Sequence, residues 1–295
     1  MSGNKATMSE NPLVTLSIIS YNQEKYIREA VLGALAQTYS PLIVAFSDDA
    51  SPDGTYGIIQ EICSKYRGPH VIRHTKNEKN LGLAAHINLI NQVAEGELIV
   101  VGAGDDISVP DRVERIALAY LESGKKSHYF YSLVTAMTEG GALEGSYQSP
   151  GHRAASSVIR AGLANYPIAI GASQAWTKHL ATNFGPMNRK IWAEDQVFGF
   201  RGILLGPVTF LNAPLVNYRS GSGLSGIKRK FDLQRYIKNQ TNVVRMYRQR
   251  ATDAFAAHRP WLGCLIGAKA VALALLFPLS PMFSVLRRID RIRRR

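Results

Sequence analysis

Pairs of acidic residues are the side chains in this sequence whose types and spacing are best suited to chemistry. Asp105 and Asp106 directly follow Gly102-Ala103-Gly104, at the end of an apolar run. Glycines let a backbone and a ligand approach each other closely. Two adjacent carboxylates can hold a hard divalent cation, usually Mg²⁺ or Mn²⁺, against a diphosphate. The alternative for this pair is a solvated turn that caps the next helix.

Two further groups of acidic residues could each have either a functional or a purely structural role. Asp48, Asp49 and Asp53 stand in a turn rich in Ser, Pro and Gly. A carboxylate there can accept hydrogen bonds from a base N–H or a ribose hydroxyl, or Asp53 can simply cap the next helix. Glu194 and Asp195 begin a predicted helix. They are either first-turn acids that favour the helix dipole or a general base facing the same pocket.

The elements that must position these acids alternate along the chain. Strands are expected over residues 14–19, 42–46, 71–74 and 98–101, helices over 25–37, 58–66 and 83–94, and another helix from Pro110. This alternation predicts an α/β fold with a mostly parallel sheet flanked by helices. Ligands bind outside the carboxyl ends of the strands in such sheets. The acids after the second and fourth strands fall at that edge.

Beyond residue 123 the pattern is less regular. The sequence predicts a strand over 129–136, a Gly-rich polar loop over 140–153, a short apolar segment over 168–176, a helical segment over 191–205 and a strand over 208–218. No motif in the segments 140–153 and 168–184 identifies a ligand or the oligomeric state.

The charge divides the chain into two regions. The net charge is +13, yet residues 1–227 hold 19 basic and 19 acidic side chains, whereas residues 228–295 hold 16 basic and three acidic ones. We expect one domain over 11–227 and a basic helical region over 228–295. A neutral first region disfavours a nucleic-acid-binding protein, which would carry a basic surface on its folded body. With 46% hydrophobic residues the chain is also neither disordered nor fibrous.

The basic region contains an apolar stretch. Residues 261–277 are apolar apart from Lys269, and six arginines lie among the last nine residues. A membrane-spanning helix needs about 20 apolar residues. The sequence therefore predicts that residues 260–295 lie in or on an anionic membrane surface without crossing it. The opening residues have no apolar run after a basic start and the two cysteines form no disulfide framework, so we expect the cytoplasmic face of the plasma membrane.

In order and spacing these motifs resemble the family 2 glycosyltransferases, inverting enzymes of the GT-A fold, and in particular those of bacterial cell-surface polysaccharides. The resemblance runs from about Leu13 to Ser225. The motifs that carry it are Leu16–Asn22, Ala36–Tyr39, Ser47–Thr55, Asn80–Asn88, Ala94–Glu97, Gly104–Arg112 and Trp192–Asp195 with Arg201.

The resemblance implies a nucleotide-diphosphate sugar as donor, which we expect to be UDP-linked, and a glycan or lipid-linked acceptor in cell-envelope glycan biosynthesis. It implies that Asp106 binds Mn²⁺ or Mg²⁺, that Asp195 deprotonates the acceptor hydroxyl and that Glu194 supports it. The nucleotide-sugar-binding residues would be Ser20, Tyr21, Asn22, Asp49, Gly82, Asp105 and Arg219.

The sequence departs from the family pattern at three places. Neither Ala103 nor Gly104 is acidic, so a strict D-x-D motif is absent and the metal site rests on the aspartate pair. Many members of the family have a histidine near the metal in the segment that corresponds to residues 218–225. This segment has Arg219 and no histidine, so we expect this arginine at the donor phosphates. The Q-x-x-R-W signature of processive polymer synthases is absent, which favours transfer of one or a few sugars over synthesis of a long polymer. A nucleotidyltransferase that makes a nucleotide-sugar is the alternative enzyme.

Overall fold

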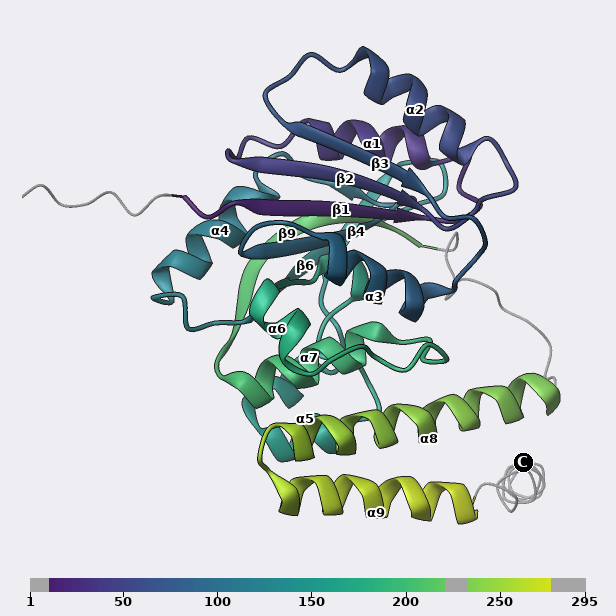
Figure 1. Ribbon diagram of the computed structural model, residues 1–295, viewed down its shortest axis with the longest axis vertical. Coiled ribbons are helices and arrows are strands. Elements are labelled where there is room, and N and C mark those ends of the chain that lie inside the picture. The colour runs from purple at the N-terminus through teal and green to yellow at the C-terminus, as the bar shows by residue number, and fades with distance from the viewer. Residues whose placement is uncertain (1–10, 221–232, 277–295) are drawn as a thin grey trace, which may run out of the picture.

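A nine-stranded sheet lies at the centre of the protein and carries helices on both faces (Figure 1). The computed structural model describes residues 11–220 and 233–276. The strands are β1 (Val14–Ser20), β2 (Leu42–Asp48), β3 (Val71–Lys76), β4 (Leu98–Ala103), β5 (Ile107–Ser108), β6 (Tyr129–Met137), β7 (Leu143–Tyr147), β8 (Ala175–Thr177) and β9 (Val208–Arg219). The α-helices are α1 (Ile27–Leu35), α2 (Thr55–Lys65), α3 (Leu83–Val93), α4 (Arg112–Glu122), α5 (Val158–Leu163), α6 (Lys178–Asn183), α7 (Glu194–Leu205), α8 (Leu233–Ala256) and α9 (Pro260–Leu276).

The first half of the sheet is parallel, as the alternating pattern predicts. Strands β3, β2, β1 and β4 lie in that order, with Val14 of β1 paired to Leu42 on one side and Leu98 on the other. Alternate apolar residues of β1, β2 and β4 pack with α1, α2 and α4 on one face. Because side chains alternate across a strand, the remaining residues of β4 face a second core on the opposite side. That core also contains residues of α3, α6 and α7.

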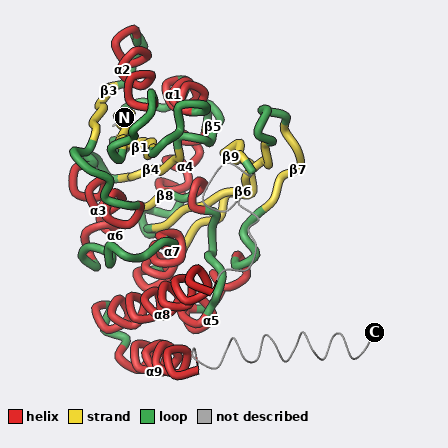
Figure 2. The backbone as a smooth tube through the Cα atoms, turned by 90° about the vertical axis from the view of Figure 1, so that its right-hand side faces the viewer, coloured by secondary structure: helices red, strands yellow, loops and turns green. Residues whose placement is uncertain are grey.

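The second half of the sheet is mixed. Strand β8 is antiparallel to both β4 and β6, β9 is parallel to β6, and β5 is antiparallel to β9. The expected loop over 140–153 contains β7, which pairs with β6 at the edge of the sheet (Figure 2). All five residues of β7 are exposed, so the strand has no buried apolar alternation by which a sequence pattern would show it. The prediction of a loop was wrong at these residues.

Helices α8 and α9 share the second core with the rest of the fold. Met246 and Tyr247 of α8 and Leu262 and Ile266 of α9 are buried in the same cluster as Phe198 of α7. The described part of the basic region is therefore packed onto the half of the molecule that contains α3, α6 and α7. Within residues 11–220 and 233–276, no helix is both long and apolar enough to cross a membrane. Residues 277–295, which hold the terminal arginines, lie outside the described residues.

Candidate active site

The carboxyl ends of β1, β2 and β4 bring two of the three acidic groups to one edge. Ser20 at the end of β1 is in register with Asp48 of β2, and its carbonyl accepts a hydrogen bond from Asp49 N at 2.9 Å. On the other side, Gly104 N donates to Ile19 O at 2.8 Å. The predicted proximity of these turns at the strand edge is thus confirmed.

Asp49 is buried and holds the segment that leads into α3. Its Oδ1 accepts from Asn77 Nδ2 at 2.8 Å and from Leu81 N at 2.9 Å, and its Oδ2 accepts from Gly82 N at 2.9 Å. A carboxylate offers about four acceptor positions, so one position is left for a ligand N–H or hydroxyl. Gly82 has a φ of 79°, a left-handed conformation that favours glycine. These contacts place Asp49 and Gly82 together, as the sequence predicts.

The turn after β1 is fixed by the turn after β2. Asn22 N donates to Ser51 Oγ at 2.8 Å, and Ser51 N in turn donates to Asp48 Oδ2 at 2.8 Å. Ser20 Oγ donates to Asp48 Oδ1 at 3.3 Å, whereas the Tyr21 side chain is 49% exposed. Asp48 is therefore the buried carboxylate that shapes the pocket wall, and Tyr21 is open to a ligand.

Gly104 packs closely against the turn after β1. A Cβ at this position would lie 2.3 Å from Gln23 Oε1 and 2.9 Å from Ile27 Cδ1, so a larger residue would require these side chains to move. Gln23 Oε1 is itself buried and accepts no hydrogen bond from any described residue, which leaves an unused acceptor beside the acids.

Asp105 and Asp106 are buried and are held by Arg219 at the end of β9. Arg219 N donates to Asp106 Oδ1 at 2.8 Å, and Arg219 Nε donates to Asp105 O at 3.1 Å. The guanidinium also reaches Glu29 Oε2 at 2.7 Å and Glu139 O at 2.8 Å. Arg219 thus lies at the acidic turn, and its contacts organise that turn. Its contact with donor phosphates stays a prediction.

The acidic turn is chemically suited to a divalent cation. Burial, together with the neighbouring charge of Asp105, raises the pKa of Asp106 well above its usual range. Two crowded carboxylates of this kind gain stability when a cation neutralises them. No cluster of three or more His, Cys, Asp or Glu side chains in the described ranges could hold a metal by itself. Asp105 and Asp106 would therefore hold a metal together with oxygens of a diphosphate.

Arg112 connects this turn to the segment that faces the second acidic pair. Its side chain is fully buried, and Nη1 donates to Ser108 Oγ at 2.9 Å while Nη2 donates to Val101 O at 2.7 Å and to Ala172 O at 2.8 Å. Burial lowers the pKa of Arg112 to about 10, against the opposing charge of Asp106. A charged anchor therefore joins the acidic turn to residues 171–174.

Glu194 and Asp195 lie on the other side of that segment, in the first turn of α7. A Cβ on Gly171 would be 2.7 Å from Glu194 Oε1 and 3.9 Å from Asp195 Oδ2, so both carboxylates face this glycine. Gln174 Nε2 donates to Glu194 Oε1 at 3.1 Å, and Gln174 Oε1 accepts from Tyr129 OH at 3.0 Å. Residues 171–174 are thus contacted both by Arg112, whose charge acts on Asp106, and by the second acidic pair.

The second acidic pair has a strong affinity for protons. Burial and the charge of Asp195 raise the pKa of Glu194, and burial raises the pKa of Asp195 although Arg250 of α8 opposes the shift. A carboxylate with a raised pKa is a stronger base than an ordinary one. This is the property that a general base for a sugar hydroxyl requires.

Sequence reasoning missed three residues that build the site. Gln174 had a visible signal, since it is a lone amide in the apolar stretch 168–176. Arg112 ends the motif Gly104–Arg112, but its contacts and those of Arg250 had no signal, because their partners lie up to 62 and 88 residues away in the chain. Trp176 is buried and stacks on Phe198 at 4.2 Å between ring centroids, whereas Trp192 is 52% exposed beside the second acidic pair.

Comparison with known proteins gives a consistent picture. Residues 15–165 match the family model described as Glycosyl transferase family 2. An uncharacterized protein of Mycobacterium tuberculosis is 34% identical over 130 residues, which are 44% of this chain and 37% of that protein. The putative glycosyltransferase EpsE of Bacillus subtilis is 34% identical over 122 residues, 41% of this chain and 42% of that protein. The matched stretches span about two fifths of the length of these relatives.

Solved structures share the fold over most of the chain. TarS of S. aureus in complex with UDP-GlcNAc has a TM-score of 0.64 at 18% identity and covers 92% of this chain and 75% of its own. The mannosyltransferase PcManGT of Pyrobaculum calidifontis in complex with GDP-Man and Mn²⁺ has a TM-score of 0.59 at 15% identity and covers 95% and 81%. The expected GT-A fold is confirmed.

Proposed function

Because the chain belongs to glycosyl transferase family 2, we propose that it transfers a sugar from a nucleotide-diphosphate donor to an acceptor hydroxyl, with inversion at the anomeric carbon. The observation that carries the proposal is that residues 171–174 face Glu194 and Asp195 and also accept hydrogen bonds from Arg112, whose charge acts on Asp106. One pair is suited to a metal and a diphosphate, and the other is suited to accept a proton.

The donor would lie at the edge formed by β1, β2 and β4. The last acceptor position of Asp49, the exposed Tyr21 and the unused Gln23 Oε1 offer contacts to a base and a ribose. We propose a UDP-linked sugar, a choice supported by the UDP-GlcNAc complex of TarS, although PcManGT binds GDP-Man on the same fold.

Asp105 and Asp106 would hold Mn²⁺ or Mg²⁺, a proposal supported by the Mn²⁺ in the PcManGT complex. When bound, the metal neutralises charge on the departing diphosphate. Arg219 keeps Asp106 in place through its backbone N–H, so the carboxylate is oriented before the donor arrives.

Asp195 would accept the proton of the acceptor hydroxyl as that oxygen forms its bond to the anomeric carbon. The bond between the anomeric carbon and the diphosphate breaks on the opposite face, which gives inversion. Glu194 stays fixed by Gln174 and keeps the pair oriented. Partial burial of the pair raises the pKa of Asp195 and so makes its carboxylate a stronger base.

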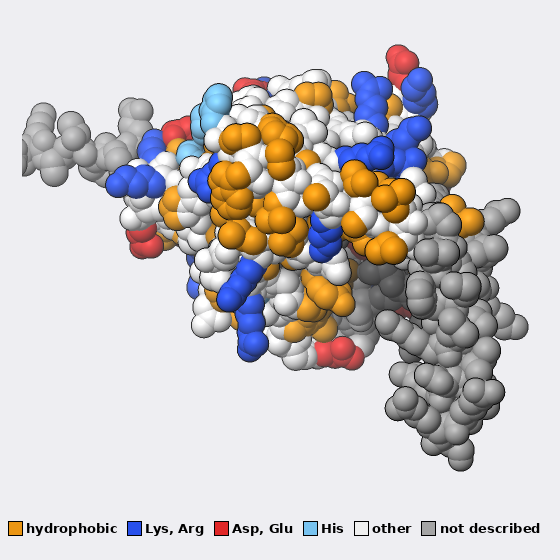
Figure 3. Space-filling model, turned by 90° about the horizontal axis from the view of Figure 1, so that it is seen from below, with side chains coloured by type: hydrophobic (Ala, Val, Ile, Leu, Met, Phe, Trp, Pro, Cys, Tyr) orange, Lys and Arg blue, Asp and Glu red, His pale blue; other side chains and the backbone are white. Residues whose placement is uncertain are grey.

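We also propose a glycan or lipid-linked acceptor in cell-envelope glycan biosynthesis, at the cytoplasmic face of the membrane. Helix α9 supports this placement. Its outer side carries Trp261, Leu265, Val271, Leu275 and Leu276, which are 41% to 71% exposed. Seen from below, this face gathers apolar side chains with lysine and arginine among them (Figure 3). An apolar face flanked by cations fits an anionic bilayer surface.

The test is nucleotide-sugar turnover by the purified protein with Mn²⁺ or Mg²⁺ across a panel of UDP- and GDP-sugars. We expect Asp106→Asn and Asp195→Asn each to lower the transfer rate by about 10²- to 10⁴-fold. Glu122→Gln, a change in an exposed acid at the end of α4 and outside the site, is the control. Full transfer by both site variants would overturn the proposal.

A further inference from the structure

A basic hollow of about 410 Å³ lies between α8 and the segment that precedes α7. Its lining residues are Asn188, Lys190, Arg245, Arg248, Gln249 and Thr252. None of them belongs to the turns after β1, β2 and β4, so the hollow is separate from the proposed donor site. We call it the basic hollow below.

The lining carries three cations and no acid. Arg245 Nη1 donates to Asn242 Oδ1 at 2.9 Å, which is a neutral partner. Among the described residues, neither Lys190 Nζ nor the Arg248 guanidinium takes part in any ion pair or side-chain hydrogen bond that the structure contains. Like charges gathered in one hollow repel each other, and an anion placed between them relieves that repulsion.

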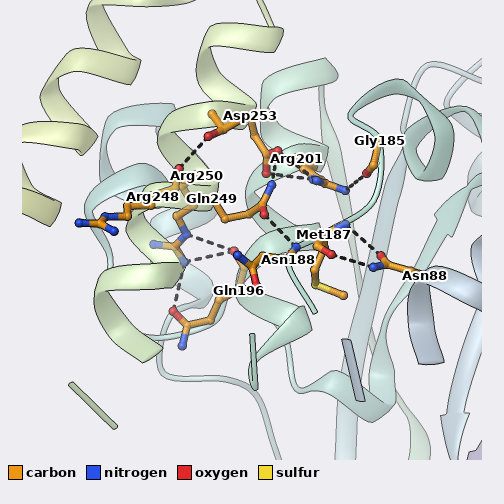
Figure 4. A network of polar contacts seen from close by, with 11 residues as sticks. Asn88, Gly185, Met187, Asn188, Gln196, Arg201, Arg248, Gln249, Arg250 and Asp253 are labelled. Carbon is orange, nitrogen blue, oxygen red and sulfur yellow. Dashed lines mark hydrogen bonds and ion pairs between the residues drawn. The ribbon is translucent and has the colours of Figure 1, made fainter. Parts of the chain in front are cut away.

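The hollow is built on a rigid frame (Figure 4). Asn188 N donates to Gln249 Oε1 at 3.0 Å, and Gln249 Nε2 donates to Asp253 Oδ1 at 3.0 Å. Asp253 pairs with Arg201 of α7 at 2.9 Å, with both side chains 1% exposed, and Arg201 Nη1 donates to Gly185 O at 3.0 Å. This network fastens both ends of the loop 185–188 to α7 and α8. The backbone that carries Lys190 and Arg248 is therefore fixed before a ligand binds.

The position of the hollow indicates which substrate it serves. Lys190 stands four residues before Glu194, the first residue of the second acidic pair, which contains the proposed general base Asp195. Arg250 follows Gln249 on α8 and donates to Gln196 O, the next residue after Asp195, at 3.2 Å. A ligand in the basic hollow would thus lie on the side of the molecule formed by α8 and the start of α7, which carries the proposed general base, and not at the donor edge.

From these observations we propose that the basic hollow binds a phosphate or diphosphate group of the acceptor. The inference rests on the proposed transferase function and names the chemical class of its acceptor. Arginine and lysine are the residues that bind phosphate oxygens most strongly, through charge-assisted hydrogen bonds. Asn188 and Thr252 add neutral polar groups to the same wall.

The first test measures binding of inorganic pyrophosphate by calorimetry to the full chain in EDTA, without donor. We expect Lys190→Gln with Arg248→Gln to weaken binding by about tenfold for each removed cation. The matched control is Arg67→Gln with Lys79→Gln, two exposed cations outside the hollow, and it should bind as the unchanged protein does. Equal binding by the hollow variant and the unchanged protein would overturn the proposal, as would an equal loss in the control.

A second probe, farnesyl diphosphate in detergent micelles, separates two sources of the phosphate. Tighter binding than pyrophosphate, lost in the hollow variant, indicates a lipid carrier, whereas equal binding of both probes indicates a soluble phosphate-bearing glycan. Binding that is insensitive to the hollow variant contradicts both. Because no donor is present, these results are independent of the transferase test: absence of nucleotide-sugar turnover by the unchanged protein would contradict the proposed function and leave the binding measurement intact.

Discussion

Glu194 and Asp195 are the residues whose chemistry depends most on their surroundings. Both carboxyls have raised pKa values, chiefly because they are buried. An ordinary aspartate has a pKa of about 3.9. The environment therefore makes Asp195 a better base and at the same time makes its charged form costly to the fold.

The pH dependence of the transfer rate should reveal that base. Asp195 must be deprotonated to accept a proton, so we expect the rate to fall as the pH falls through its raised pKa. The inflection should lie well above pH 4, and measurement of kcat/KM from pH 4.5 to pH 9 would locate it. A rate that stays level down to pH 4.5 would contradict the assignment of Asp195.

The stability of the protein should change with pH in the opposite sense. Between its ordinary and its raised pKa, a buried carboxyl stays protonated in the folded state while the unfolded state has lost the proton. The free energy of unfolding therefore falls as pH rises through this window. We expect Asp195→Asn to raise the melting temperature at pH 8 and to change it little at pH 4. Glu122→Gln serves as the comparison, and a stabilisation of equal size at both pH values would refute this linkage.

At the scale of elements, the contact between α7 and α8 is the junction on which the site depends. The Arg201–Asp253 pair crosses it with both side chains buried. Burial also raises the pKa of Asp253 against the favourable charge of Arg201. A buried ion pair adds little to the free energy of unfolding, because desolvation of the two charges offsets their attraction. Removing only one partner leaves an unpaired buried charge, which destabilises the folded state strongly.

Removing one partner of this pair should destabilise the fold strongly. We expect Asp253→Leu or Arg201→Met alone to lower the free energy of unfolding by about 3–5 kcal/mol. The double variant should recover a large part of the loss, since it leaves no unpaired buried charge. Urea denaturation of the three variants measures this, and strictly additive losses would show that the two side chains do not act as a pair.

The elements show what the sequence can and cannot predict. The strand ends that carry Asp49 and Asp106 were predictable because continuous apolar runs stop there, and the start of α7 at Glu194 followed from helical spacing. The strand β7 was not predictable, because all of its residues are exposed and its sequence shows no alternation of apolar and polar residues. Nor were the contacts of Arg112 and Arg250, since local patterns hold no information about partners that only the folded chain brings close.

On the scale of the whole molecule, the described cations of α8 lie in two different environments. Arg250 of α8 is buried and serves the acidic pair, whereas Arg248 lines the basic hollow. The sequence alone presented residues 228–295 as one basic region. Among the described residues of this region, Arg250 lies at the second acidic pair, Arg245 and Arg248 line the basic hollow, and Lys269 of α9 donates to Leu163 O.

Membrane binding should depend on the outer side of α9. Deleting the helix is a poor test, because Leu262 and Ile266 are part of the core. We expect Trp261→Ser, Leu265→Ser and Leu275→Ser together to reduce cosedimentation with phosphatidylglycerol vesicles by at least about tenfold, since each loses apolar burial in the bilayer.

The matched control changes exposed apolar residues on other helices, Leu32→Ser, Val93→Ser and Leu118→Ser. It should sediment with the vesicles as the unchanged protein does. Equal cosedimentation of the α9 variant and the control would argue against α9 as the membrane surface, and equal binding to phosphatidylcholine vesicles would argue against a role for charge.

The sharing of one core by α7 and α9 has a geometric consequence. Ile266 of α9 and Phe198 of α7 lie in the same buried cluster, so the helix that would rest on a bilayer and the helix that carries the base form one rigid piece. In such an arrangement the distance between the bilayer surface and the proposed base is fixed. The arrangement would hold the base at a constant height above the lipid surface and select acceptors whose reactive hydroxyl stands at that height, so that a sugar chain grown beyond it would no longer be a substrate.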